Sequence, residues 1–208
     1  LIREARNINI NEPELNLPRI ALMMATGTGK TVVMAMLIAY NYLNKRQYRQ
    51  DIRFADNFLV IAPGITIKDR LGVLYYNTGI DNYDYYGQRD LIPDQYKKEM
   101  EGLNSRLVII NRHALEKSTL KGNKKTPFDG KIQEDGKKHT GKENFELVRR
   151  RVLGKIKKGS RLLIFNDEAH HCYYPKQKGR NTDEEKSKDE NERAAVWFNG
   201  LKELNIVY

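Results

Sequence analysis

Two groups of residues in this sequence carry the side chains that phosphate chemistry needs. The first is the stretch 24–31, which contains Gly27 and Gly29 and ends in Lys30 and Thr31. Glycine has no Cβ, so its backbone can bring a row of N–H groups close around phosphate oxygens. Lys30 would reach the β and γ phosphates as a mobile charge, and the Thr31 hydroxyl would bind Mg²⁺. The pattern predicts a phosphate-binding loop whose contacts come from Ala25, Thr26, Gly27, Thr28, Gly29, Lys30 and Thr31.

The second group is a pair of adjacent carboxylates, Asp167 and Glu168, which follows an apolar run. Asp167 would hold Mg²⁺ through its water shell, and Glu168 would orient or deprotonate the water that attacks the phosphate. Hydrolysis needs both charge neutralisation and a positioned nucleophile, so this pair would complete what Lys30 and Thr31 begin. Lys30 and Asp167 lie 137 residues apart along the chain. We therefore expect the fold to bring them together, on adjacent strands, around one triphosphate.

Apolar runs that end in polar turns predict the strands that position these groups. The runs cover residues 19–25, 58–63, 106–111 and 161–165. Continuous apolar runs are typical of strands buried in a parallel sheet. Helical patterns occupy residues 31–45 and 143–158. The sequence predicts an α/β fold with a mostly parallel sheet flanked by helices on both faces, which binds ligands at the carboxyl ends of its strands.

The other segments carry weaker patterns. Residues 1–17 alternate charge with isolated Ile and Leu and are expected to form a helix and a turn, and residues 206–208 are expected to begin a further strand. Five tyrosines between residues 75 and 86 favour an ordered surface loop over a platform for stacking bases, because acidic residues accompany them. The lysine-rich insertion 116–142 and the charged loop 175–192 contain few apolar side chains, so we expect both to be flexible.

Composition bounds the function further. The net charge of the 208-residue chain is +10 and its pI is near 9.5, which favours an anionic partner, with nucleic acid first. Simple solubility is the alternative explanation. One cysteine excludes an internal disulfide and a zinc cluster, and no apolar run approaches the roughly 18 residues that a membrane span needs. We expect a cytoplasmic protein with no membrane contact.

The two groups also resemble motifs of a known class of motor. Ala25–Thr31 and the Asp-Glu-Ala-His string at 167–170 resemble motifs I and II of DEAH-type superfamily two helicases and translocases. Met24 departs from the general phosphate-loop pattern, which has glycine at that position. The restriction subunit of type III restriction enzymes is similar over three wider strings: 24–31, 62–70 and 166–173.

This resemblance implies a domain organisation and a set of cofactors. Residues 1–208 would form the first, amino-terminal RecA-like P-loop domain and would end before the third motif of the class. ATP and Mg²⁺ would be the cofactors, with Thr31 and Asp167 as metal ligands. Catalytic roles are implied for Lys30, Asp167, Glu168 and His170, of which His170 would couple the nucleotide site to the rest of the motor.

The resemblance also indicates where nucleic acid would bind. In this class, the turns that follow the second and third strands of the domain contact the phosphate backbone. The matching residues here are Thr66, Lys68 and Arg70, then Asn111, Arg112 and His113. Their side chains are donors that suit phosphate contacts. Plain strand-to-helix connections, with His113 as a local hydrogen-bond partner, are the alternative.

The function implied is that of an ATP-driven DNA translocase of the type III restriction kind. Its partners would be duplex DNA, a modification (methyltransferase) subunit, and a second RecA-like domain and a nuclease domain of the full-length chain. An RNA or DNA unwinding helicase outside restriction is an alternative, because phosphate contacts do not distinguish DNA from RNA. A nucleotide switch or a metabolic kinase on a related sheet is a third hypothesis.

Overall fold

A parallel three-stranded sheet forms the centre of the molecule. The computed structural model describes residues 2–7 (backbone only), 20–79, 83–116, 143–169 and 198–208. The sheet has the order β4-β3-β5, with β3 at Asn57–Ala62, β4 at Leu107–Asn111 and β5 at Leu162–Asn166. In register, Phe58 lies beside Leu107 on one side and Leu163 on the other. All six residues of β3 are buried, which explains their continuous apolar run.

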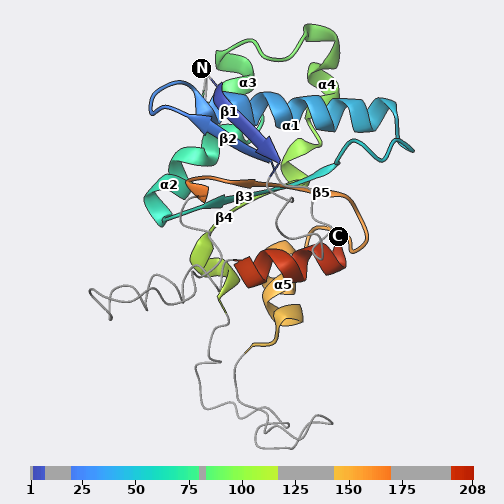
Figure 1. The fold of residues 1–208 in the computed structure, drawn as a ribbon. Helices are drawn as coiled ribbons and strands as arrows, with labels where there is room; N and C mark the ends of the chain where they lie inside the picture. The colour runs from blue at the N-terminus through green and yellow to red at the C-terminus, as the bar shows by residue number, and fades with distance from the viewer. Residues whose placement is uncertain (1, 8–19, 80–82, 117–142, 170–197) are drawn as a thin grey trace, which may run out of the picture.

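Helices cover both faces of this sheet (Figure 1). Above it lie α1 (Lys30–Gln47), α3 (Tyr85–Gln88) and α4 (Lys97–Met100), and below it lie α5 (Phe145–Leu153) and a helix over residues 198–207. Alternate residues of β3 serve the two cores: Phe58 and Val60 face the α1 side, and Leu59 and Ile61 face the α5 side. The predicted α/β architecture is confirmed, with a smaller sheet than expected.

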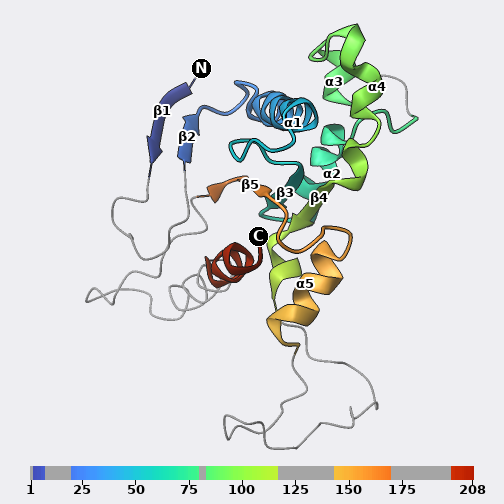
Figure 2. The same cartoon turned by 90° about the vertical axis from the view of Figure 1, so that its right-hand side faces the viewer.

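The strand before the glycine loop lies outside this sheet. We expected a buried strand there, but β2 (Ile20–Met24) is largely exposed, with Ile20 72% accessible. It pairs antiparallel with β1 (Ile2–Asn7) in a separate two-stranded sheet, beyond the β5 edge (Figure 2). The helix predicted for residues 1–17 is therefore wrong at 2–7, where the backbone pairs antiparallel with β2. A short apolar run does not reveal its burial or its partner.

The end of the chain is helical where a strand was predicted. Residues 198–207 form one helix, whose Phe198 and Leu204 are buried. Leu201 and Leu204 pack against the α5-side core, three residues apart on one face. The exposed Ile206 belongs to the last turn of this helix, so the apolar character of residues 206–208 misled the prediction.

The tyrosines of 75–86 contribute to the core. Tyr86 is buried and meets Tyr76 edge to face at a centroid distance of 5.9 Å. Tyr75 and Tyr85 pack, partly buried, against the α1-side core. The predicted surface loop is therefore wrong for these rings, which are used in packing. The two segments predicted to be flexible lie outside the described residues, apart from Glu116.

Candidate active site

The glycine loop leads directly into the longest helix. Gly27 and Gly29 adopt φ of 75° and 90°, in the left-handed region that favours glycine. Gly29 is the N-cap of the 18-residue helix α1 and has no side chain to cap it. The Thr28 hydroxyl donates to the carbonyl of Ala25 at 2.6 Å and closes the loop. An uncapped helix N-terminus presents backbone N–H groups and positive potential, which suit a phosphate.

The loop and the distant carboxylates meet through one ion pair. Lys30 Nζ donates a hydrogen bond to Glu168 Oε1 at 2.9 Å, and each side chain is 34% exposed. This hydrogen bond raises the pKa of Lys30 above its usual value, while partial burial acts in the opposite direction. The expected meeting of the two groups is therefore observed. It does not occur on adjacent strands, because β2 and β5 belong to different sheets and Lys30 is the first residue of α1.

A backbone hydrogen bond holds Asp167 at the end of β5. Asp167 N donates to the carbonyl of Ile61 at 3.0 Å, which continues the pairing with β3 beyond the strand. Burial raises the pKa of Asp167, the Glu168 charge raises it further, and Lys30 opposes both. Glu168 has φ of 53°, a left-handed conformation that costs a non-glycine residue roughly 1–3 kcal/mol. Such strain is concentrated at functional sites, and the Glu168 side chain here contacts Lys30.

The chemistry of these donors fits a magnesium–nucleotide complex. Mg²⁺ usually takes one or two carboxylates, with phosphate oxygens and water as its remaining ligands. Asp167 would supply that carboxylate, and Thr31 follows Lys30 in the first turn of α1. No group of three or more His, Cys, Asp or Glu side chains lies close enough for an all-protein metal site within the described ranges. A cation held here by Asp167 and Thr31 would complete its coordination with phosphate oxygens and water.

A comparison with models of protein families identifies the family of this chain. The family model described as "Type III restriction enzyme, res subunit" matches residues 3–196. The chain belongs to this family. Searches of curated proteins and of solved structures gave no significant match.

Membership in the res subunit family settles the class of the domain. It is a RecA-like P-loop fold and a helicase-like, ATP-hydrolysing motor of the restriction-system type. In the part of the chain that the structure describes, no helix is both long and apolar enough to cross a bilayer.

The candidate nucleic-acid residues of this res-family chain gather at one edge of the sheet. Thr66, Lys68 and Arg70 are exposed on α2 (Ile65–Arg70), which follows β3. Asn111, Arg112 and His113 lie at the start of the 3₁₀ turn η6 (Arg112–Leu115), which follows β4. The two turns are neighbours, because Ala62 at the end of β3 pairs with Asn111.

Two of the candidate nucleic-acid residues, Asn111 and His113, already make local contacts. Asn111 Oδ1 accepts from Ala114 N at 3.1 Å and caps η6. His113 Nδ1 lies 2.7 Å from Glu116 Oε1, and Arg112 Nε is buried without a hydrogen-bond partner among the described residues. Contact of these six residues with nucleic acid stays a prediction. His170 lies outside the described residues.

One polar residue at the site escaped the sequence prediction. Asn166 ends β5 immediately before Asp167, and its Oδ1 atom is buried without a hydrogen-bond partner in the described ranges. A buried acceptor without a donor is costly, so such atoms at a site point to a function. The signal in the sequence was an asparagine at the end of an otherwise apolar run.

Proposed function

We propose that this chain binds ATP with Mg²⁺ and hydrolyses it to drive movement along duplex DNA. The observation that carries the proposal is the 2.9 Å contact between Lys30, at the glycine loop, and Glu168. It supports a single site in which a phosphate-binding cation and a potential general base lie within reach of the same group.

Lys30 would exchange partners when ATP enters. Its ammonium group is partly exposed, so the γ-phosphate can take the place of the Glu168 carboxylate without first opening a buried site. Glu168, released from Lys30, would then orient the attacking water and accept its proton. Thr31 and Asp167 would hold Mg²⁺, which neutralises the charge that develops on the phosphate oxygens.

The complete motor would need groups beyond these residues. In phosphoryl-transfer enzymes, an arginine supplied from another domain or protein contributes roughly 10³ to 10⁵ in rate. We propose that a second RecA-like domain supplies this arginine and that His170 transmits the state of the nucleotide to it. A modification subunit and a nuclease domain complete the system that we infer from the family.

The test is the ATPase activity of the full-length protein with duplex DNA, single-stranded DNA and RNA as separate stimulants. We expect the strongest stimulation by duplex DNA and its loss in Lys30→Ala. Stimulation by RNA or single strands alone would favour the unwinding helicase instead. If no nucleic acid stimulates an enzyme that still binds ATP, the nucleic-acid motor is rejected and a nucleotide switch takes its place.

A further inference from the structure

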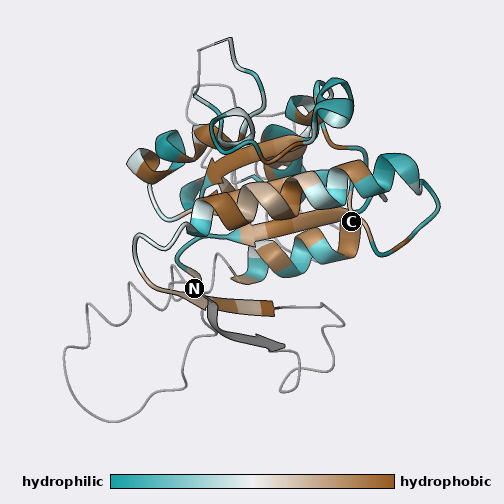
Figure 3. Ribbon diagram, turned by 90° about the horizontal axis from the view of Figure 1, so that it is seen from above, coloured by the Kyte–Doolittle hydropathy of each residue, from teal (hydrophilic) through white to brown (hydrophobic). Residues whose placement is uncertain are grey.

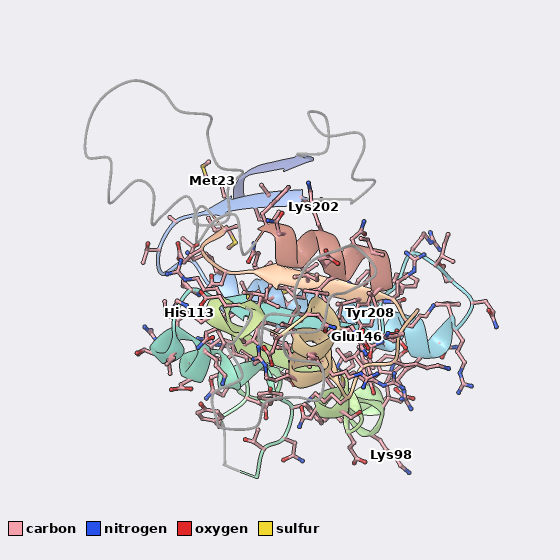
Figure 4. All side chains as sticks on the ribbon, turned by 90° about the horizontal axis from the view of Figure 1, so that it is seen from below. Met23, Lys98, His113, Glu146, Lys202 and Tyr208 are labelled. Carbon is pink, nitrogen blue, oxygen red and sulfur yellow. The ribbon has the colours of Figure 1, made fainter. Side chains whose placement is uncertain are left out.

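Positive charge is concentrated on α5 and on the turn that follows it. Residues 143–161 contain seven Lys or Arg and only two Glu, a net charge of +5 in 19 residues. Six of these cations are solvent-exposed. Lys155 donates to the carbonyl of Asn104 at 3.1 Å, and we call the other five the α5 tract: Arg150, Arg151, Lys157, Lys158 and Arg161. Figure 4 shows this face of the molecule from below, with Glu146 near its centre.

The two acidic residues neutralise only part of this positive charge. Glu143 pairs with Arg151 at 2.9 Å. Glu146 is shared by Arg149, Arg150 and Lys158, at 2.9, 3.1 and 3.0 Å. The hydrogen bonds from Arg149 and then Lys158 hold the pKa of Glu146 far below its usual range, so one negative charge faces three positive ones. Elsewhere in the tract, Lys157 and Arg161 form no ion pair with any residue that the structure describes. A surplus of exposed positive charge therefore remains.

The tract continues from the candidate nucleic-acid residues at the carboxyl edge of the sheet. Arg151 Nη2 donates to the carbonyl of Glu116 at 3.2 Å, and Glu116 in turn holds His113 of η6. At the other end, the carbonyl of Arg161 accepts from Asn57 at 3.5 Å, at the amino end of β3. Between these ends lies α5, with nine residues and a length of about 13 Å. A duplex of that length carries about eight phosphate charges along its axis.

The composition of this surface fits nucleic acid better than a protein. Protein interfaces depend on buried aromatic and apolar anchors and are depleted in lysine. Among the described residues of α5 and its turn, Leu147 is the exposed large apolar side chain, and the rest of the exposed surface is mainly Arg and Lys. A surface of exposed cations with few apolar anchors suits the sugar–phosphate backbone.

We propose that the α5 tract binds the backbone of duplex DNA and extends the contact from η6, across the α5 face, to the amino edge of the sheet. The proposal rests on the proposed function, in which duplex DNA is the track. It adds a second contact region on the face of the sheet opposite α1. DNA engaged there and at η6 would be held at two separated points.

The test compares two variants of the full-length protein that lose the same charge. One is Arg150→Gln/Lys157→Gln/Lys158→Gln in the tract, and the matched control is Arg49→Gln/Arg89→Gln/Lys98→Gln on the exposed α1 side. Affinity for a short duplex is measured by fluorescence anisotropy between 50 and 200 mM salt. Each lost phosphate contact lowers the slope of log affinity against log salt by about 0.9. We expect the magnitude of this slope to fall by about three in the tract variant, whose duplex binding should be at least about tenfold weaker. In the control the slope should fall by less than about one.

Several results would overturn the proposal. Equal losses of duplex affinity in both variants would mean that only the net charge matters. An unchanged salt slope in the tract variant would show that the tract does not contact DNA phosphates. A loss of RNA binding without a loss of duplex binding would assign the surface to another ligand. If the wild-type protein binds ATP but no DNA, both this inference and the proposed movement along duplex DNA are rejected. If the tract variant keeps wild-type DNA affinity and DNA-stimulated ATPase activity, only the inference fails.

Folding of the variants is checked by thermal unfolding and by ATP binding without DNA. Lys157→Gln alone provides a second variant, because Lys157 makes no described side-chain contact that folding could need. It should lower the slope by about one.

Discussion

The Lys30–Glu168 ion pair defines what a phosphate must displace at this site. Both side chains are only partly exposed, and Glu168 is held in a strained backbone conformation. The types of these residues and their distance along the chain were enough to predict that they meet. The left-handed conformation of Glu168 and the orphan acceptor of Asn166 were not predictable, because both depend on the exact path of the backbone after β5.

Replacing Glu168 by glutamine should separate binding from hydrolysis. Glutamine keeps the shape of the side chain but removes both the base and the charge that competes for Lys30. We expect turnover to fall by about 10²- to 10⁴-fold, with ATP bound at least as tightly as before. Single-turnover hydrolysis and titration with a fluorescent ATP analogue measure the two effects. Lys30→Ala is the control and should lose binding itself; undiminished turnover in Glu168→Gln would show that another group is the base.

The pKa of Asp167 makes a prediction about stability and pH. Because burial and the Glu168 charge raise this pKa, the folded state binds the Asp167 proton more tightly than the unfolded state does. The ionised carboxylate is therefore destabilising at neutral pH. Asp167→Asn should raise the melting temperature at pH 7 in the absence of metal. The gain should shrink as the pH falls through the raised folded-state pKa and vanish below the unfolded value near 3.8.

Thermal unfolding of both proteins between pH 3 and 8 measures this difference. The variant should also lose Mg²⁺-dependent hydrolysis, which distinguishes the site from a merely structural carboxylate. A lower melting temperature at pH 7 would contradict the assigned cause of the shift.

At the scale of elements, β3 positions the site because it belongs to both cores. The apolar runs of β3 and β4 were readable because a strand buried on both faces carries mainly apolar side chains (Figure 3). The run of β5 is equally apolar, although its residues are only partly buried. The antiparallel pairing of β1 with β2 could not be predicted from the sequence, since strand pairing depends on residues distant in sequence. The same limit applies to residues 206–207, which belong to a helix that packs against the α5-side core through Leu201 and Leu204.

Truncation in β3 should therefore be costly. Leu59 is fully buried, between the sheet and the α5 layer, so Leu59→Ala leaves a cavity. We expect a loss of about 2–5 kcal/mol in the free energy of unfolding, measured by urea denaturation. Ile65→Ala is the matched control, because Ile65 is exposed at the start of α2 and should change stability by no more than about 0.5 kcal/mol.

At the scale of the whole molecule, nucleotide binding should appear as added stability. A ligand that binds only the folded state, at 100 times its dissociation constant, stabilises it by about 2.7 kcal/mol. We expect ATP with Mg²⁺ to raise the melting temperature of the wild-type protein but not that of Lys30→Ala. Scanning calorimetry with a non-hydrolysable analogue measures the shift. An equal shift in both proteins would place the nucleotide away from the glycine loop.

The split between the two sheets gives the glycine loop an unusual mechanical setting. The loop connects the exposed strand β2 to α1, which is packed on the main sheet. In the ranges that the structure describes, β1 and β2 share no ladder with β3, β4 or β5. The glycine loop is therefore the direct backbone connection between this ribbon and α1, whereas Asp167 is hydrogen-bonded to β3 through the carbonyl of Ile61.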